Sequence, residues 1–100
     1  MTEESEIKRK IKKYLDSVGA FWSAVTGGAY SKPGDPDLIA CFRGRYIAIE
    51  AKTPRGVQSP IQKRRQREIM EAGGIYILAR NTEDVEDVIE EICAEQDYDI

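Results

Sequence analysis

Two carboxylates and a lysine stand in a spacing that could support metal-dependent hydrolysis. Asp37 opens one apolar run, within residues 34–39, and Glu50 and Lys52 close the next apolar run as Glu-x-Lys. The chain contains no histidine, and its two cysteines are too far apart to form a zinc motif. Any hydrolytic chemistry would therefore depend on carboxylates, a lysine and a hard cation held by oxygen ligands.

The spacing of the two runs predicts that these side chains share one face of a β-hairpin. A two-residue turn at Arg43-Gly44 places Asp37 directly opposite Glu50, and a four-residue loop preserves this pairing, whereas a three-residue loop would break it. The two Cβ atoms would then lie about 5 Å apart. Lys52 would point to the same side, roughly 7 Å further along its strand, while Ile47 and Ile49 would point into the core.

Two carboxylates this close repel each other, so one takes up a proton unless a cation lies between them. Mg²⁺ or Mn²⁺ suits such oxygen ligands, and the backbone carbonyl of Ala51 is a candidate third ligand. The ion could hold an attacking water and stabilise charge on a phosphodiester. Lys52 could position that water or neutralise the developing charge. The competing interpretation is a surface ladder of opposite charges, but an uncompensated pairing of Asp37 with Glu50 would be destabilising.

The surrounding pattern predicts a single α/β domain over residues 1–100 with the order α-β-β-β-α-β and an extra C-terminal helix. Apolar periodicity, capping residues and Gly/Pro breaks place the helices and strands in the chain. The expected helices are 3–18, 60–72 and one capped by Thr82, and the expected strands are 21–25, 36–42, 45–52 and 75–79. They form a small mixed sheet flanked by helices, with a Gly/Pro-rich loop over 26–36 and a flexible tail over 96–100.

Charge is segregated along the chain, although the net charge is only −3. Residues 83–100 hold nine acidic and no basic residues, so the 15 basic residues, against nine acidic ones, give residues 1–82 a charge of +6. Each basic cluster alone would be a solvated helix face, but two clusters flanking Glu-x-Lys favour phosphate binding. The candidate nucleic-acid-binding residues are Lys8, Arg9, Lys12, Lys32, Arg55, Lys63, Arg64 and Arg67. The acidic last helix either repels DNA from the outer surface or docks on a partner subunit.

The chain resembles the VRR-NUC domain of the PD-(D/E)xK nucleases. The matching pieces are Glu4-x-x-Ile7, Gly34-x-Pro36-Asp37-Leu38, Ile49-Glu50-Ala51-Lys52, Ser59-Pro60-x-Gln62 and Gly73-Gly74. The resemblance implies the PD-(D/E)xK restriction-endonuclease-like core, with Asp37 and Glu50 as metal ligands and Lys52 as a catalytic residue. It also implies that Gln62 supports the site, although a surface glutamine on a basic helix is the alternative.

The same resemblance implies a glutamate from the first helix, for which Glu3, Glu4 and Glu6 compete. Glu3 and Glu4 fall within the apolar stripe of the helix, whereas Glu6 points away from it; Glu4 also fits the family spacing to Ile7 and is therefore the expected residue. The alternative is that all three glutamates stabilise the helix dipole.

Stand-alone members that this chain resembles are phage or bacterial proteins, similar to Holliday-junction resolvases and homodimeric. The resemblance therefore implies a Mg²⁺- or Mn²⁺-dependent DNA endonuclease that is selective for branched DNA such as Holliday junctions. A non-specific or restriction-type duplex nuclease, or a catalytically silent nucleic-acid-binding module, are the alternatives. The dimer interface could use residues 75–79, the last helix or the Trp22 strand. No cofactor beyond the metal is expected.

The sequence also predicts an intracellular protein, and the resemblance implies the cytoplasm of a bacterium or a phage-infected cell. The N-terminus is charged, which argues against a signal peptide, and no apolar run approaches the length of a membrane span. Cys41 and Cys93 each fall among apolar neighbours, which predicts two buried free thiols.

Overall fold

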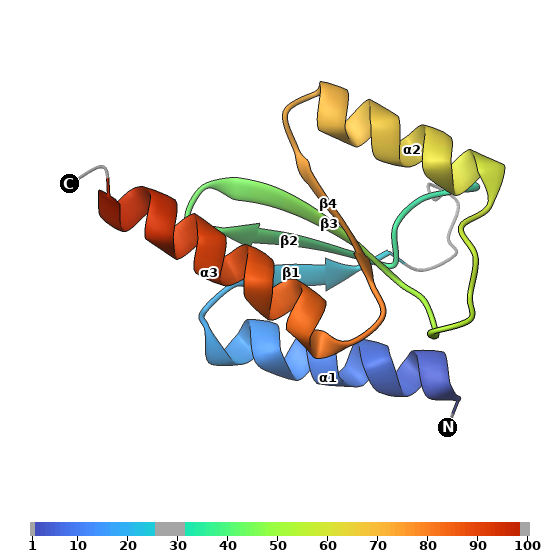
Figure 1. The fold of residues 1–100 in the computed structure, drawn as a ribbon, viewed down its shortest axis with the longest axis horizontal. Helices are drawn as coiled ribbons and strands as arrows, with labels where there is room; N and C mark the ends of the chain where they lie inside the picture. Colours follow the sequence, from blue (N-terminus) through green and yellow to red (C-terminus); the bar gives the residue numbers. More distant parts are fainter. Residues whose placement is uncertain (1, 26–31, 99–100) are drawn as a thin grey trace.

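The computed structural model describes residues 2–25 and 32–98, and its elements follow the order α-β-β-β-α-β-α (Figure 1). The helices are α1 (Glu3–Ser17), α2 (Pro60–Glu71) and α3 (Thr82–Tyr98). The strands are β1 (Phe21–Ala24), β2 (Leu38–Phe42), β3 (Arg45–Ala51) and β4 (Ile75–Ala79). The predicted fold class and element order are therefore confirmed. Part of the predicted Gly/Pro-rich loop, residues 26–31, lies outside the described residues.

The four strands form one mixed sheet in the order β1-β2-β3-β4. The first three strands are antiparallel neighbours, whereas β4 runs parallel to β3 because α2 carries the chain back between them. In Figure 1, α1 and α3 lie together on one side of the sheet, and α2 lies on the other. The fold thus has three layers, with β3 in the interior of the sheet.

The hydrophobic core lies between the sheet and the α1/α3 layer. Alternate strand residues point into it, and Ile47 and Ile49 are fully buried there, as predicted. From α1, Ile11 and Leu15 complete the core, and α3 adds an apolar stripe that includes Val85. Each fully buried side chain of this size stabilises the fold by about 1.5–3 kcal/mol. The opposite face of β3 is consequently free for polar residues.

The β2–β3 turn has the geometry that the sequence predicts. Arg43 and Gly44 have φ angles of 49° and 82°, the two positive values that a two-residue type I′ turn requires. Pairing runs from Phe42 opposite Arg45 to Leu38 opposite Ile49. One residue further along the same register, Asp37 lies opposite Glu50, so the predicted register is confirmed.

The last helix differs from its prediction at both ends. The side chain of Asn81, rather than that of Thr82, caps α3 by accepting a hydrogen bond from the Asp84 amide at 3.0 Å. At the other end the helix continues to Tyr98, although residues 96–100 were expected to form a flexible tail. The Gln96 amide donates to the Arg43 carbonyl at 3.0 Å, and this contact with the hairpin holds the last turn.

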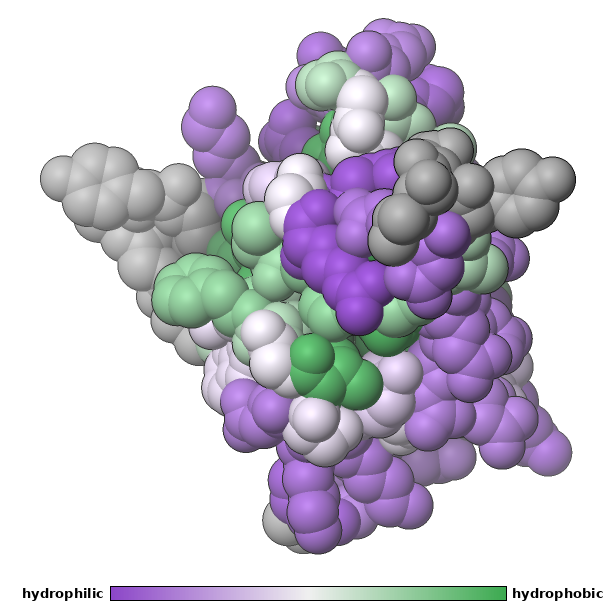
Figure 2. Space-filling view, turned by 90° about the vertical axis from the view of Figure 1, so that its left-hand side faces the viewer, coloured by the Kyte–Doolittle hydropathy of each residue, from purple (hydrophilic) through white to green (hydrophobic). Residues whose placement is uncertain are grey.

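The predicted burial of both thiols is wrong, because Cys41 is exposed and Cys93 is half-buried. Cys41 points away from the core, and α2 lies over β4 rather than over β2. Its cross-strand neighbours Phe21 and Tyr46 are also exposed, by 73% and 45%. Figure 2 views the end of the molecule that carries the hairpin and shows hydrophobic residues gathered between hydrophilic ones.

No helix within residues 2–25 and 32–98 is both long enough and apolar enough to cross a membrane.

Gly34 shapes the loop that leads into Asp37. Its φ is 86°, and a Cβ built on it would lie 2.8 Å from the Ile61 carbonyl oxygen in the first turn of α2. From α2, the Arg65 Nη2 atom donates to the Pro33 carbonyl at 3.2 Å. The loop therefore packs directly against α2, which only glycine permits at position 34.

We expect Gly34→Ala to destabilise the fold more than Gly19→Ala. Gly19 also has a positive φ, 76°, but a Cβ there would meet nothing within 4 Å. Gly19→Ala should therefore lower the free energy of unfolding only by the backbone strain, about 1–2 kcal/mol. Gly34→Ala should lower it by a further 1–3 kcal/mol, roughly, because the added methyl group overpacks the contact with α2. Urea unfolding of both variants measures the difference, and equal losses would contradict the close packing of this loop.

Candidate active site

Glu50 is the one charged residue buried among the described residues, with only 3% of its surface exposed. It lies on β3, on the face opposite the core. Its Oε1 atom accepts a hydrogen bond from Gln62 Nε2 at 2.8 Å and lies 3.9 Å from Lys52 Nζ. Its Oε2 atom is buried without a hydrogen-bond partner. A buried carboxylate oxygen in this state is costly unless a cation or a proton satisfies it.

Asp37 faces Glu50 from the residue that precedes β2. Its Oδ2 atom accepts a hydrogen bond from the Ala51 amide at 2.8 Å, and its Oδ1 atom lies 3.7 Å from Lys8 Nζ. The amide and the carbonyl of one strand residue point toward the same neighbouring strand, so the Ala51 carbonyl also faces the Asp37 side. Oxygens from two strands thus converge beside Glu50.

The surroundings raise the pKa of Glu50 to about 7. Burial, which disfavours the charged form, is the largest cause, and the negative charge of Asp37 is the second. The Lys52 ammonium lowers the pKa, although not enough to offset these two effects. The fold therefore holds two carboxylates in a position that favours an added positive charge.

Gln62 joins the start of α2 to this carboxylate. Ser59 and Gln62 form a capping box, in which the Gln62 amide donates to Ser59 Oγ at 3.2 Å and the Ser59 amide donates to Gln62 Oε1 at 2.9 Å. This arrangement fixes the side chain of Gln62, so that its Nε2 atom points at Glu50. The Gln62 side chain is half-buried and contacts Glu50.

The three candidate glutamates of α1 have different surroundings. Glu6 pairs with Arg9 at 2.6 Å, and this hydrogen bond lowers the pKa of Glu6. Glu3 is exposed and lines a separate hollow beside the turn that follows β3. The charge of Glu4 is among those that raise the pKa of Glu50. Glu4 is therefore the α1 glutamate whose charge acts on the candidate site.

The donor set fits a hard divalent cation. Asp37 and Glu50 supply carboxylate oxygens, one of them buried and unpartnered, and the Ala51 carbonyl faces the same side. Within residues 2–25 and 32–98, no three acidic, cysteine or histidine side chains converge as a metal cluster. A cation here would keep several waters, which is the usual state of Mg²⁺ in proteins.

The residues predicted to bind nucleic acid lie on the elements that carry the site. They belong to α1, the loop before β2, the turn after β3, and α2. Some of these cations already have partners within the protein: Lys8 with Asp37, Arg9 with Glu6, Arg64 with Glu68, and Lys12 over the ring of Trp22 at 5.5 Å. The proximity of Lys8 to Asp37 has no signal in the sequence, because it depends on how α1 packs against the sheet.

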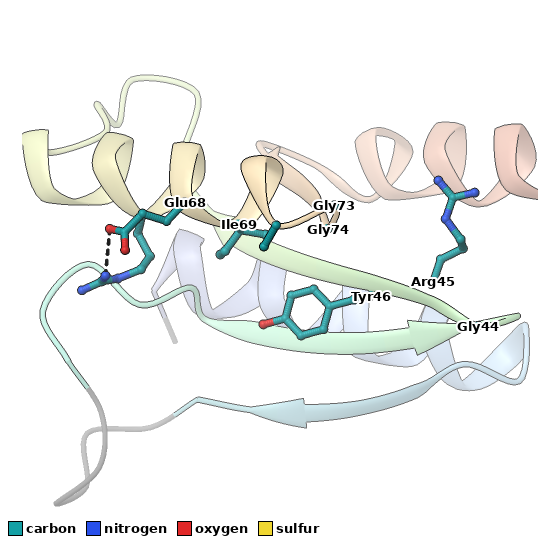
Figure 3. Close-up of a pocket in the computed structure, with 9 residues that line it drawn as sticks. Gly44, Arg45, Tyr46, Glu68, Ile69, Gly73 and Gly74 are labelled. Atoms are coloured by element: carbon teal, nitrogen blue, oxygen red, sulfur yellow. Dashed lines mark hydrogen bonds and ion pairs between the residues drawn. The ribbon is translucent and has the colours of Figure 1, made fainter.

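A groove on the surface lies away from the candidate site. This groove, of about 640 Å³, separates the hairpin from the C-terminal part of α2. Figure 3 shows Tyr46 in the middle of the groove, with Arg45 toward one end and Glu68 toward the other. Neither Asp37 nor Glu50 lines it.

Comparisons with known proteins identify the fold. No family model and no curated protein matches the chain. A solved structure described as a VRR_NUC domain superposes with a TM-score of 0.76 and 22% identity, covering 90% of this chain and 97% of that one. Hjc, a Holliday junction resolvase from the archaeal hyperthermophile Archaeoglobus fulgidus, gives a TM-score of 0.57 and 20% identity over 75% of this chain and 65% of that one. The predicted resemblance to VRR-NUC domains is thus confirmed for the fold, which is PD-(D/E)xK-like.

The raised pKa of Glu50 gives the metal-free protein a pH-dependent stability of defined sign. The ordinary pKa of a glutamate is 4.5, and that of Glu50 in the folded protein is about 7. The contribution of Glu50 to the free energy of unfolding is therefore fully present below about pH 4.5 and is lost as the pH rises through 7. Glu50→Gln carries no charge but keeps an oxygen for Gln62. We expect its stability relative to the native protein to increase by about 2–3 kcal/mol between pH 5 and pH 8.

Urea unfolding at the two pH values, with a chelator present, measures this change. Parallel stabilities of the native protein and Glu50→Gln across that range would contradict the buried, repelled state of Glu50.

Proposed function

We propose that this protein is a divalent-metal-dependent DNA endonuclease that hydrolyses phosphodiester bonds. The observation that carries the proposal is the buried Glu50 carboxylate, held opposite Asp37 and beside Lys52 on one face of the sheet. This arrangement is costly for a purely structural protein and useful for one that binds a cation. The VRR-NUC-like fold supports the same activity.

Each side chain has a role that its position supports. Asp37, Glu50 and the Ala51 carbonyl would hold Mg²⁺ or Mn²⁺, which when bound supplies Lewis-acid chemistry and water activation. Gln62 keeps Glu50 Oε1 oriented, so that Oε2 is left for the cation. Lys52, whose ammonium lies 3.9 Å from Glu50, stabilises negative charge on the phosphate or orients the attacking water. Glu4 would add a further negative charge near the cation.

The basic residues of α1, α2 and the adjoining loops would bind the DNA backbone. Four of the candidate side chains, Lys32, Arg55, Lys63 and Arg67, are exposed and take part in none of the ion pairs found among the described residues. Phosphate contacts of this kind position DNA without reading its sequence. From the similarity of the fold to a Holliday junction resolvase we propose selectivity for branched DNA, such as four-way junctions, in the cytoplasm of a bacterium or a phage-infected cell.

A homodimer would supply two such sites related by a two-fold axis. Of the interfaces considered from the sequence, the Trp22 strand, β1, has the strongest support. It is an edge strand, and its Phe21 is 73% exposed in a row with Cys41 and Tyr46, which are exposed as well. β4 is the other edge of the sheet, but both α2 and α3 pack against it.

Cleavage of labelled DNA in Mn²⁺ tests the activity. We expect the native protein to cut a four-way junction in preference to a flap or a linear duplex. Lys52→Ala and Asp37→Ala should each lower kcat by about 10²- to 10³-fold, because each removes charge stabilisation at the reacting phosphate or the cation. Arg45→Met, at the far end of β3, is the matched surface control and should retain native activity.

Equal rates for the native protein and Lys52→Ala would overturn the mechanism. Equal cleavage of duplex and junction would instead support a non-specific or restriction-type nuclease. DNA binding without any cleavage would identify a catalytically silent module.

Sedimentation tests the proposed dimer. We expect the native chain of 11.3 kDa to sediment as a dimer and Phe21→Glu to sediment as a monomer, since a charge would be buried in the interface. Met70→Glu is the control, because Met70 is an exposed apolar residue outside this face, on α2. A monomeric native protein, or two equally dimeric variants, would contradict an interface on β1.

A further inference from the structure

Arg80, between β4 and α3, makes an unusual set of contacts with the chain that follows Lys52. Its Nη1 atom donates to the carbonyls of Thr53, Pro54 and Gly56 at 2.7, 3.3 and 2.8 Å. Three carbonyl dipoles that point at one place repel each other unless a positive group lies there. One half-buried guanidinium nitrogen thus stabilises the conformation of this turn through charge-assisted hydrogen bonds.

The turn lies directly against the base of Lys52. The Gly56 amide donates to the Thr53 carbonyl at 2.9 Å, which closes a four-residue turn with Arg55 at its exposed tip. A Cβ built on Gly56 would lie 3.4 Å from the Lys52 Cβ atom. A change in the conformation of this turn would therefore displace the Lys52 side chain or the backbone of residue 52.

Ala79 and Arg80 contact the chain at Lys52 and just after it: Ala79 binds the Lys52 amide, and Arg80 binds the turn that follows. The Lys52 amide donates to the Ala79 carbonyl at 2.9 Å, which extends the β3–β4 pairing by one residue. Arg80 is itself fixed, because its amide donates to Asp84 Oδ2 at 2.8 Å in the first turn of α3. The N-terminus of the acidic last helix is thereby connected to the lysine of the candidate site.

We propose that Arg80 is a positioning residue, which fixes the 53–56 turn and through it the location of Lys52 at the reacting phosphodiester. This inference rests on the proposed nuclease activity. Because the Nη1 atom of Arg80 is directed at backbone carbonyls, its charge acts within the protein rather than on DNA phosphates. Arg80 therefore differs in role from Arg55, which projects from the tip of the same turn.

Steady-state kinetics on a four-way junction in Mn²⁺ test the effect on catalysis. Arg80→Met should lower kcat about 10- to 100-fold, the usual effect of a misplaced catalytic group, and leave KM within about twofold of the native value. Arg80→Lys should recover most of the loss, since a single nitrogen makes all three bonds and an ammonium can donate to the same carbonyls. Arg45→Met, the matched control, should match the native protein.

The salt dependence of junction binding, measured in Ca²⁺, separates positioning from direct DNA contact. Arg80→Met should leave the slope of log K against log salt unchanged, whereas Arg55→Met should reduce it by about one phosphate contact. An equal reduction of the slope in both variants would identify Arg80 as a DNA-binding residue and overturn the proposal.

Amide hydrogen exchange without DNA or metal gives a readout that does not depend on activity. In Arg80→Met the Gly56 amide should exchange at least tenfold faster, while amides in the core strands remain protected. Native exchange at Gly56, or faster exchange spread over the whole chain, would overturn the positioning role. A native protein that fails to cut DNA would count against the proposed function, but the exchange result would still decide whether Arg80 holds the turn.

Discussion

The placement of one ionisable side chain, Glu50, in the interior of the sheet is the constraint to which the rest of this structure responds. Burial and the facing Asp37 carboxylate both oppose its charge, and they raise its pKa to about 7. Hydrogen bonding offsets part of this cost at one oxygen, through Gln62, and leaves the other oxygen without a partner. A bound cation would lower this pKa and stabilise the charged form, and the proposed metal-dependent chemistry rests on this effect.

Several distant segments are fixed in relation to that carboxylate. The β2–β3 hairpin sets its register opposite Asp37, and the capping box of α2 aims Gln62 at it. Gly34 lets the loop that precedes Asp37 pack against the first turn of α2. Beyond β3, Arg80 holds the turn that follows Lys52. Because the core is confined to the α1/α3 side of the sheet, the other side can carry these polar groups without loss of core packing.

Local sequence signals predicted the parts of the site that depend on local geometry. The Arg43-Gly44 turn and the two-residue period of strands were enough to place Asp37 opposite Glu50. The position of Ser59 and Pro60 located the start of α2, whereas the choice of Gln62 came from the family resemblance. These signals involve residues close together in the chain, so no long-range information was needed.

Contacts that join distant segments were not predictable in the same way. The bonds of Arg80 are made to backbone carbonyls, which every residue possesses, so no pattern of side chains signals them. The approach of Lys8 to Asp37 depends on the packing of α1 against the sheet. The exposure of Cys41 depends on α2 covering β4 instead of β2. Apolar neighbours in the sequence indicate a strand but not which of its faces is covered.

The central claim is that Asp37, Glu50 and the Ala51 carbonyl together bind a divalent cation. Anomalous diffraction from a crystal soaked in Mn²⁺ tests it most directly, because it locates the ion without reference to activity. The account predicts one strong peak at about 2.1–2.2 Å from a carboxylate oxygen of each acidic residue, and no peak there in Glu50→Gln. A native crystal without density between these two carboxylates, or with manganese only at other positions, would contradict it.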